Sequence, residues 1–304
     1  MQPATILVIG SSNMDMIVKS ASLPRPGETV IGGAFSMAPG GKGANQAVAA
    51  ARLGGHVTFV TCLGDDEFGR GLRRLYERDG IDTSRVQMLA QTHTGVAFIL
   101  VDSRGENMIS VASGANARFT PERLQVLERL EPTPRWVLLQ LEIPLATVEA
   151  AAGWAKRCGA GVILDPAPAP AAGLPSSLLC FVDILTPNEI EAGALVGRTV
   201  ATLDEAVAAG RALIDRGTRE VIVKLGERGG VCVSTSGHWM YPTPRVEAVD
   251  TTAAGDCFAG ALAVGLSEGM STREAAAFAA RAAAISVTRM GAQSSLPRRD
   301  EIPN

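Results

Sequence analysis

The chain has 304 residues, of which 46% are hydrophobic and 19% are charged, with a formal net charge of −3. This length and composition fit one large α/β domain or two smaller ones. The charge is small and no basic run occurs, which argues against nucleic acid as the main partner. Every apolar run is shorter than the ~18 residues that a membrane-spanning helix needs, so no membrane partner is expected.

Cysteine and histidine content bears on compartment and metals. Five cysteines lie far apart, with no C-x-x-C pair. Separated cysteines in an odd number are typical of reduced thiols, so we expect a cytoplasmic location. The three histidines, at 56, 93 and 238, have no paired spacing, and a zinc site is therefore not expected.

The first half of the chain alternates predicted strands and helices, with two β-rich interruptions. Continuous apolar runs predict buried strands at 4–10 and 56–64, and helices that end at Gly are predicted at 43–55 and 67–80. The interruptions lie near 15–38, with Pro and Gly turns, and at 94–112, which reads as a hairpin. We expect them to form a separate small sheet, a candidate lid.

From about residue 135 the rhythm becomes regular. Strands are predicted at 135–141, 161–168, 181–188 and 220–226, a hairpin at 229–242, and helices at 145–158, 188–196, 203–217, 255–268 and 272–288. Strands that alternate with helices of this length are typical of a mostly parallel sheet with helices on both faces.

Two segments near the N-terminus are candidate binding sites. In "GGKG" (40–43) the glycines allow close backbone approach, and Lys42 and Asn45 lie at the mouth of a helix. The alternative is a flexible turn with a surface lysine. In "GSSNMDM" (10–16), Asn13 and Asp15 follow a strand and point the same way, which suits the hydroxyls of a polyol. The alternative is a solvated turn.

Two further segments have features of a nucleotide site. In "TPNEIEAGAL" (186–195), Asn188 and Glu191 share a helical face and would suit a hydrated Mg²⁺ beside phosphates. A helix cap with a capping-box Glu explains them equally well. In "VIVKLGERGG" (221–230), Lys224 ends a strand, and Gly226 and Gly229 leave room for a flat ligand, although an ordinary hairpin is the alternative. The dinucleotide fingerprint G-x-G-x-x-G is absent, which disfavours a dehydrogenase.

The segment "DTTAAGD" (250–256) predicts a small-residue turn that opens a helix. The backbone N–H groups of Ala253, Ala254, Gly255 and Asp256 would form an anion hole at the helix N-terminus. Asp256 would then take a proton from a hydroxyl while the amides stabilise a transferred phosphoryl group. The alternative is that Asp256 merely caps the helix.

Together these segments resemble the ribokinase-like carbohydrate kinases. The two signatures of that family resemble "GGKGANQAVAAARLG" (40–54) and "DTTAAGDCFAGAL" (250–262), and the resemblance runs nearly end to end. It implies one α/β kinase domain, 1–304, with a three-layer fold and a small β-sheet lid formed by about 14–39 and 93–113. It also implies a homodimer through that lid.

The resemblance assigns roles residue by residue. Asp256 would be the general base, with the anion hole formed by Ala253, Ala254, Gly255 and Asp256. The sugar would be held by Asn13, Asp15, Gly41, Lys42, Asn45, Glu142 and Asp256. Asn188 and Glu191 would order Mg²⁺, and ATP would lie along Asn188, Lys224, Gly226, Gly229 and Gly255. A K⁺ site would comprise Asp250, Thr252, Ser286, Arg289, Gly291 and Ser295.

Two positions depart from the pattern that the resemblance implies. Cys257 stands where relatives often have Thr or Ser, facing the anion-hole turn, with an effect on rate or oxidation sensitivity. Ala280 stands where many relatives place Asn or His near adenine, which leaves base selectivity open.

The leading hypothesis is ATP-dependent phosphorylation of the 5-hydroxyl of D-ribose, since in-line phosphoryl transfer needs positioning and charge neutralisation. The same-class alternative is another sugar or a nucleoside, for which only Phe98 would offer a stacking aromatic near the hairpin. The different-class alternative is a sugar-binding regulator without catalysis. The expected partners are a small-molecule sugar and ATP.

Overall fold

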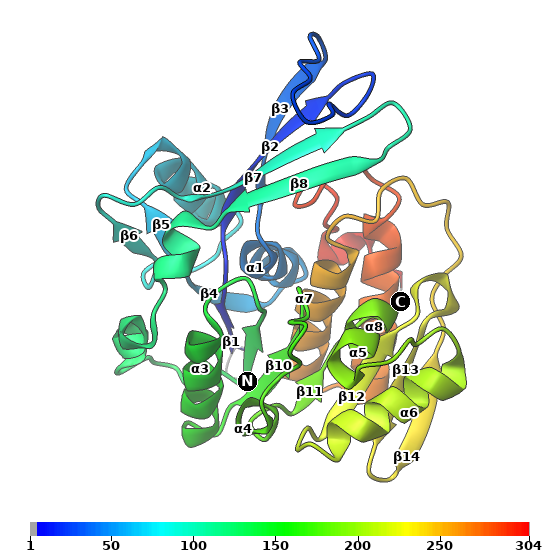
Figure 1. The fold of residues 1–304 in the computed structure, drawn as a ribbon. Helices are drawn as coiled ribbons and strands as arrows, with labels where there is room; N and C mark the ends of the chain where they lie inside the picture. The colour runs from blue at the N-terminus through cyan, green and yellow to red at the C-terminus, as the bar shows by residue number, and fades with distance from the viewer. Residues whose placement is uncertain (1–4, 304) are drawn as a thin grey trace.

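The structure, a computed structural model, describes residues 5–303. Its central sheet has eight strands in the order β14-β13-β12-β11-β10-β9-β1-β4 (Figure 1). The six strands from β12 to β4 are parallel, and β13 and β14 are antiparallel. The strands are β1 (Thr5–Ile9), β4 (His56–Val60), β9 (Trp136–Leu139), β10 (Gly161–Leu164), β11 (Ile184–Leu185), β12 (Glu220–Lys224), β13 (Gly230–Ser234) and β14 (Gly237–Tyr241).

Helices cover both faces of this sheet, as predicted. Residues alternate along β1, so that Ile6 and Val8 join one apolar core while Leu7 and Ile9 join the other. The first core contains α1 (Lys42–Arg52), α2 (Glu67–Arg78), α7 (Ala254–Ser267) and α8 (Thr272–Ser286). The second contains α3 (Leu145–Arg157), α4 (Ser176–Leu179), α5 (Glu189–Val196) and α6 (Leu203–Ile214). The predicted three-layer α/β fold is confirmed.

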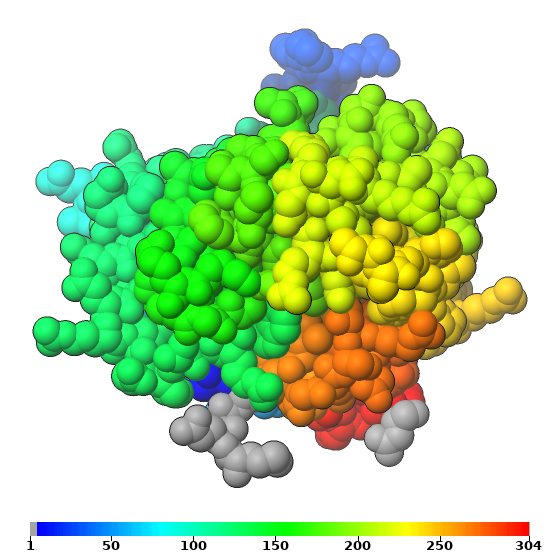
Figure 2. All heavy atoms as spheres, turned by 90° about the horizontal axis from the view of Figure 1, so that it is seen from below, coloured from blue at the N-terminus to red at the C-terminus, as the bar shows by residue number. Residues whose placement is uncertain are grey.

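A second sheet of four strands stands apart from the central one (Figure 1). It joins β2 (Asn13–Lys19), β3 (Ala34–Gly40), β7 (Gly95–Val101) and β8 (Asn107–Ala112) in the order β3-β2-β7-β8. The small sheet is therefore present where the two β-rich interruptions were predicted. In the view from below, its blue end projects beyond the body of the protein (Figure 2). Its function as a lid stays a prediction.

The predicted strand at 56–64 is wrong in one respect. The chain leaves the central sheet after Val60, and β5 (Cys62–Gly64) pairs instead with β6 (Gln87–Leu89) in a two-stranded sheet. Both halves are buried and apolar, and such a pattern does not distinguish one sheet from another. Of the predicted first strand, residue 4 lies outside the described residues, as do 1–3 and 304 of the predicted domain. No helix within 5–303 has both the length and the apolar character to cross a membrane.

Candidate active site

A cleft of about 1070 Å³ lies beyond the carboxyl ends of the central strands. In open α/β sheets this edge is where ligands bind. The cleft brings together residues that are far apart in sequence: Lys42, Asp165, Asn188, Glu191, Lys224, Gly226, Gly229, Ala253, Ala254, Gly255 and Asp256. The predicted catalytic and nucleotide residues therefore share one cleft.

Asp256 lies in the first turn of α7 but does not cap it. The position before the helix is Ala253, and no side chain caps this terminus. The Asp256 carboxylate instead faces α1, where Oδ2 accepts from Asn45 Nδ2 (2.9 Å) and Oδ1 accepts from Gln46 Nε2 (3.1 Å). The interpretation of Asp256 as a simple helix cap is therefore wrong.

The surroundings of Asp256 suit a base that works near neutral pH. Only 4% of the residue is exposed. Burial raises the pKa of its carboxyl to about 6, with a further upward contribution from Asp165 that Lys42 opposes. A carboxylate with this pKa is mostly ionised at pH 7 and still accepts a proton readily.

The turn before Asp256 has the geometry of an anion site. Ala253 adopts a left-handed conformation (φ 60°, ψ 11°), which turns the chain into α7. A Cβ built on Gly255 would lie 3.2 Å from Lys224 Nζ, so the ammonium stands beside the turn. The N–H of Ala254 donates to the Thr251 carbonyl at 3.2 Å and is already engaged. The amides of Gly255 and Asp256 belong to the first helical turn, whose N–H groups have no partner within the helix.

The predicted sugar residues gather around the start of α1. Glu142 Oε2 accepts from the Lys42 backbone N–H (3.0 Å) and from Ser11 Oγ (2.6 Å). Gly41 precedes the helix with φ 89°, and an added Cβ would come within 2.9 Å of the Ser12 backbone. A side chain at Gly41 would therefore push the backbone of Ser12 and Asn13 away from α1.

Asn13 and Asp15 approach the same region from β2. Asn13 Oδ1 accepts from Asn116 Nδ2 at 2.7 Å. A Cβ on Gly40 would lie 2.2 Å from Asp15 Oδ2, so that glycine makes room for the carboxylate. Burial, with Glu142 nearby, raises the pKa of Asp15 to about 6. Asn13 and Asp15, the two side chains predicted to bind a polyol, are therefore held in place in a partly buried setting.

Lys42 is not the surface lysine of the alternative interpretation. Its side chain is surrounded by the carboxylates of Asp256, Asp165, Glu142 and Glu191. Burial alone would lower the pKa of Lys42, but these carboxylates outweigh it and raise the pKa well above its ordinary value. The ammonium is therefore a fixed positive charge that lines the cleft.

Asn188 and Glu191 form a capping box at the start of α5. Asn188 Oδ1 accepts from the Glu191 N–H and Glu191 Oε2 accepts from the Asn188 N–H, both at 2.8 Å. Burial raises the pKa of Glu191, although Lys224 opposes this. Glu191 also lines the cleft, and a carboxylate there fits Mg²⁺ that keeps most of its waters.

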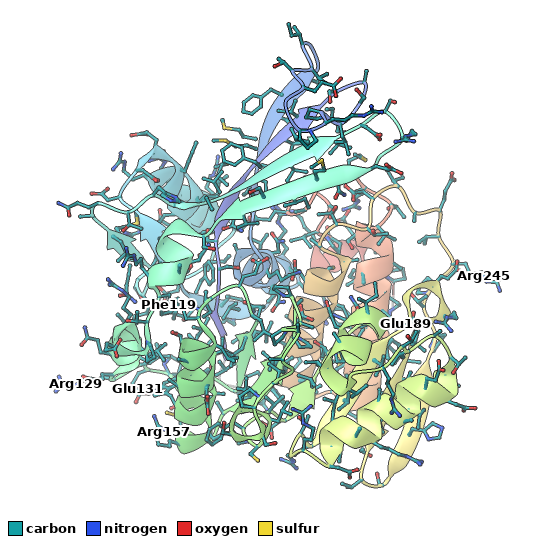
Figure 3. All side chains as sticks on the ribbon, viewed as in Figure 1. Phe119, Arg129, Glu131, Arg157, Glu189 and Arg245 are labelled. Carbon is teal, nitrogen blue, oxygen red and sulfur yellow. The ribbon has the colours of Figure 1, made fainter. Side chains whose placement is uncertain are left out.

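Part of the cleft lining is apolar and consists of Phe258, Ala280, Ala283, Ala284 and Val287, and Gly226 and Gly229 also line the cleft. Both glycines have positive φ (59° and 81°), and nothing lies within 4 Å of a Cβ on Gly226. Figure 3 shows Glu189 at the start of α5 and Arg245 extending outward, and both residues line the cleft. This wall offers a flat ligand van der Waals contact.

Comparison with known proteins gives the family. Residues 3–299 match the model of the pfkB family carbohydrate kinase. The chain is 44% identical to a ribokinase of Haemophilus influenzae over 298 residues, covering 98% of this chain and 96% of the relative. It is 40% identical to a deoxyribokinase of Salmonella typhimurium over 292 residues, covering 96% and 95%.

The chain belongs to the pfkB carbohydrate kinase family. A solved structure of Arabidopsis thaliana ribokinase complexed with ribose and ATP superposes with a TM-score of 0.90, at 34% identity, covering 99% of this chain and 98% of that one. The predicted resemblance to ribokinase-like kinases is confirmed, and this pfkB kinase is a phosphotransferase.

In this pfkB kinase, Asp250 directly precedes the turn of residues 251–255 that opens α7, called here the anion-site turn. Its Oδ1 accepts from the Thr252 N–H (2.9 Å) and its Oδ2 accepts from the Gly291 N–H (2.8 Å). These hydrogen bonds outweigh desolvation and lower the pKa of the carboxyl, so it stays ionised. An ionised carboxylate is the kind of oxygen ligand that hard cations prefer, so Asp250 has the chemistry that the predicted cation site needs.

In the predicted K⁺ set, Ser286 is the last residue of α8, and Arg289, Gly291 and Ser295 lie on the segment that follows this helix. The Ser286 carbonyl accepts from the Arg289 N–H (3.1 Å), and the Ala292 carbonyl accepts from Ser295 N (3.2 Å) and Oγ (2.7 Å). The Arg289 guanidinium forms an ion pair with Glu301. Within residues 5–303, no cluster of three His, Cys, Asp or Glu side chains suits a metal.

Cys257 differs from its predicted setting in the pfkB kinase. The residue is fully buried, and its thiol lies among Ser286 and Arg289 rather than in the cleft. Burial raises the pKa of the thiol to about 12, so it is protonated at neutral pH. Since the thiolate is the reactive form, the structure argues against the predicted oxidation sensitivity.

Two buried residues of the site were missed from the sequence. Asp165 follows β10 and accepts from Lys224 Nζ at 2.9 Å. Gln46, next to Asn45 on α1, donates to both Asp165 and Asp256. Asp165 had a signal, because an acid directly after a buried strand lies at the ligand-binding edge. Gln46 had none, because its partners lie 119 and 210 residues away.

Proposed function

We propose that this pfkB kinase transfers the γ-phosphoryl group of ATP to the 5-hydroxyl of D-ribose. The observation that carries the proposal is the single cleft that holds the buried Asp256 carboxylate, the anion-site turn and the Lys224 ammonium. Relatives named ribokinase, one of them in complex with ribose and ATP, support ribose as the acceptor.

In the proposed reaction the Asp256 carboxylate takes the proton of the sugar hydroxyl. The hydroxyl oxygen forms a bond to the γ-phosphorus while the bond from that phosphorus to the leaving ADP oxygen breaks. The turn amides and Lys224 stabilise the negative charge on the transferred group. Asn13, Asp15, Gly41, Lys42, Asn45 and Glu142 orient the sugar, and Gly226, Gly229 and Gly255 accommodate the nucleotide.

Two ions belong to the proposal. Glu191 and Asn188 would hold Mg²⁺ through its waters, and the ion supplies positive charge to the phosphates. Asp250, with oxygens of Thr252, Ser286, Arg289, Gly291 and Ser295, would hold K⁺. Because Asp250 ties the 250–253 loop to Gly291, an ion there would steady the anion-site turn without contacting substrate.

The small sheet is proposed to act as a lid and as a homodimer contact in a cytoplasmic enzyme. It exposes large apolar side chains on strands β3, β7 and β8, including Phe35 (62% exposed), Phe98 (53%) and Ile109 (57%). Sedimentation velocity tests this point. A dimer that a Phe35→Asp change converts to monomer supports the contact, whereas a monomeric parent protein contradicts it.

A second candidate acceptor is 2-deoxyribose. The deoxyribokinase relative matches the chain almost as well as the ribokinase relative does. The two sugars differ by one hydroxyl, and a site that hydrogen-bonds this group discriminates strongly against its absence.

The test is ADP release over a panel of ribose, 2-deoxyribose, other sugars and nucleosides, with and without K⁺. We expect kcat/KM for ribose to exceed that for every other acceptor by at least about tenfold. A higher kcat/KM for 2-deoxyribose than for ribose would identify 2-deoxyribose as the acceptor instead. Ribose binding by calorimetry with no turnover on any acceptor would favour the non-catalytic regulator instead.

A further inference from the structure

A chain of side-chain contacts runs from the Asp256 carboxylate to the Lys224 ammonium. Asp256 Oδ1 accepts from Gln46 Nε2 (3.1 Å), and the same nitrogen donates to Asp165 Oδ2 (3.1 Å). Asp165 Oδ1 in turn accepts from Lys224 Nζ (2.9 Å). One primary amide therefore stands between two carboxylates, with one hydrogen directed at each.

The orientation of the Gln46 amide is determined by its oxygen. Gln46 Oε1 accepts from Gln140 Nε2 at 2.6 Å, so the nitrogen must face the two carboxylates. Gln46 is fully buried, so its amide has no contact with bulk solvent and depends on these side-chain partners. The amide is thus held in one orientation from both sides.

The two ends of this chain face the reacting groups of the proposed reaction. At one end Asp256 meets the sugar hydroxyl. At the other end Lys224 Nζ lies 3.2 Å from the Cβ position of Gly255, at the phosphate end of the cleft. Asp165, Lys224 and Asp256 all line the cleft, whereas Gln46 lies behind them.

We propose that Gln46 is a positioning residue that holds the general base Asp256 and couples it to the Asp165–Lys224 ion pair. This proposal rests on the proposed function. In this arrangement the amide fixes the Asp256 carboxylate toward the sugar. When a phosphate group interacts with the Lys224 ammonium, the electrostatic interaction between Lys224 and Asp165 changes. This change reaches Asp256 through the single side chain of Gln46.

The charged groups that act on Asp256 are Lys42 from α1 and Asp165 after β10, and Asp165 is itself paired with Lys224 of β12. The Cys257 thiol, the next residue on α7, also interacts with the Asp256 carboxylate. Asn45 of α1 contributes a neutral donor to Oδ2. Changes at Gln46 and Asp165 should therefore shift the titration of Asp256 in opposite directions, since one removes a hydrogen-bond donor and the other removes a negative charge.

The experiment compares Gln46→Met and Asp165→Asn with the parent kinase. We expect Gln46→Met to lower kcat at least about tenfold, the loss typical of removing a hydrogen bond to a charged group, with the Kd for ribose nearly unchanged. The acidic limb of its kcat/KM profile should move to higher pH. The acidic limb of Asp165→Asn should move to lower pH.

Gln87→Met is the matched control, because Gln87 is a half-buried amide on β6 that bonds the Arg123 carbonyl outside the cleft. It should leave both kcat and the pH profile unchanged. Unfolding in urea separates stability loss from loss of positioning. The Asp256 carboxyl signal, followed by ¹³C NMR without substrate, gives a second readout that does not depend on turnover.

The outcomes are distinct. Shifts of the two acidic limbs in the same direction, or a normal kcat in a folded Gln46→Met protein, would overturn the role of Gln46. A parent protein that turns over no sugar refutes the proposed function. In that case opposite shifts of the Asp256 carboxyl signal still support the coupling, and equal shifts overturn it.

Discussion

Replacing Asp256 by Asn should reduce catalysis and change the pH dependence of stability. The variant keeps the shape of the side chain but is a poor base, so kcat should fall at least ~10²-fold while ribose binding is largely kept. A coupled ADP-release assay and calorimetry measure these two quantities.

The stability effect follows from the raised pKa. Burial, assisted by Asp165, raises the pKa of Asp256 from 3.8 to about 6, so the folded protein binds this proton more tightly than the unfolded chain. The stability that protonation of Asp256 contributes is therefore fully present below pH 3.8 and is lost as the pH rises through about 6. The ionised carboxylate therefore lowers the free energy of unfolding by about 2 kcal/mol at pH 5 and by about 3 kcal/mol at pH 8.

Asn carries no charge and escapes this penalty. Its Nδ2 would face the donor of either Asn45 or Gln46, at a cost of about 1–3 kcal/mol that does not depend on pH. The absolute stability is thus less informative than its slope. Relative to the parent, Asp256→Asn should gain about 1–2 kcal/mol of stability between pH 5 and pH 8 in urea unfolding. Parallel stability curves, or a near-normal kcat, would refute the reasoning.

Three further predictions concern the surroundings of Asp256. Asp250→Ala removes the link between the Thr252 and Gly291 amides, so the dependence of kcat on K⁺ should weaken, and a K⁺ titration identical to the parent's would refute the cation site. Ala253→Gly should change the free energy of unfolding by less than about 1 kcal/mol because Gly suits φ 60°, whereas Ala253→Val should lose about 2 kcal/mol or more; equal stabilities in thermal unfolding would contradict this. Ala280→Phe should narrow the apolar part of the cleft and raise the KM for ATP at least about tenfold without changing the Kd for ribose. An unchanged KM for ATP would show that the adenine binds elsewhere.

Much of the fold could be predicted because its elements have strong local patterns. The apolar run 4–10 becomes β1, and the Gly-terminated pattern 43–55 becomes α1. The division of 56–64 between two sheets could not be predicted, since β5 leaves the central sheet only to meet β6 more than 20 residues later. Pairing of this kind depends on tertiary contacts rather than on local periodicity.

The same distinction holds in the cleft. Asn188 and Glu191 of the capping box are only three positions apart, and the box could be predicted as one of two interpretations. The turn that precedes Asp256 was likewise predictable from "DTTAAGD". The contacts of Gln46 with Asp165 and Asp256 were not, because they exist only once α1, β10 and α7 meet.

Helix α1 constrains how such an enzyme changes its substrate in evolution. It carries Asn45 and Gln46, which hydrogen-bond to Asp256, and Lys42 and Asn45, which are proposed to bind the sugar. It also packs tightly on α7, where a Cβ on Gly260 would lie 2.8 Å from Ala49. A substitution on α1 that altered sugar preference would also disturb Asp256, the proposed general base. Divergence toward new acceptors is therefore expected to accumulate on the small sheet, where side chains can be exchanged without moving Asp256.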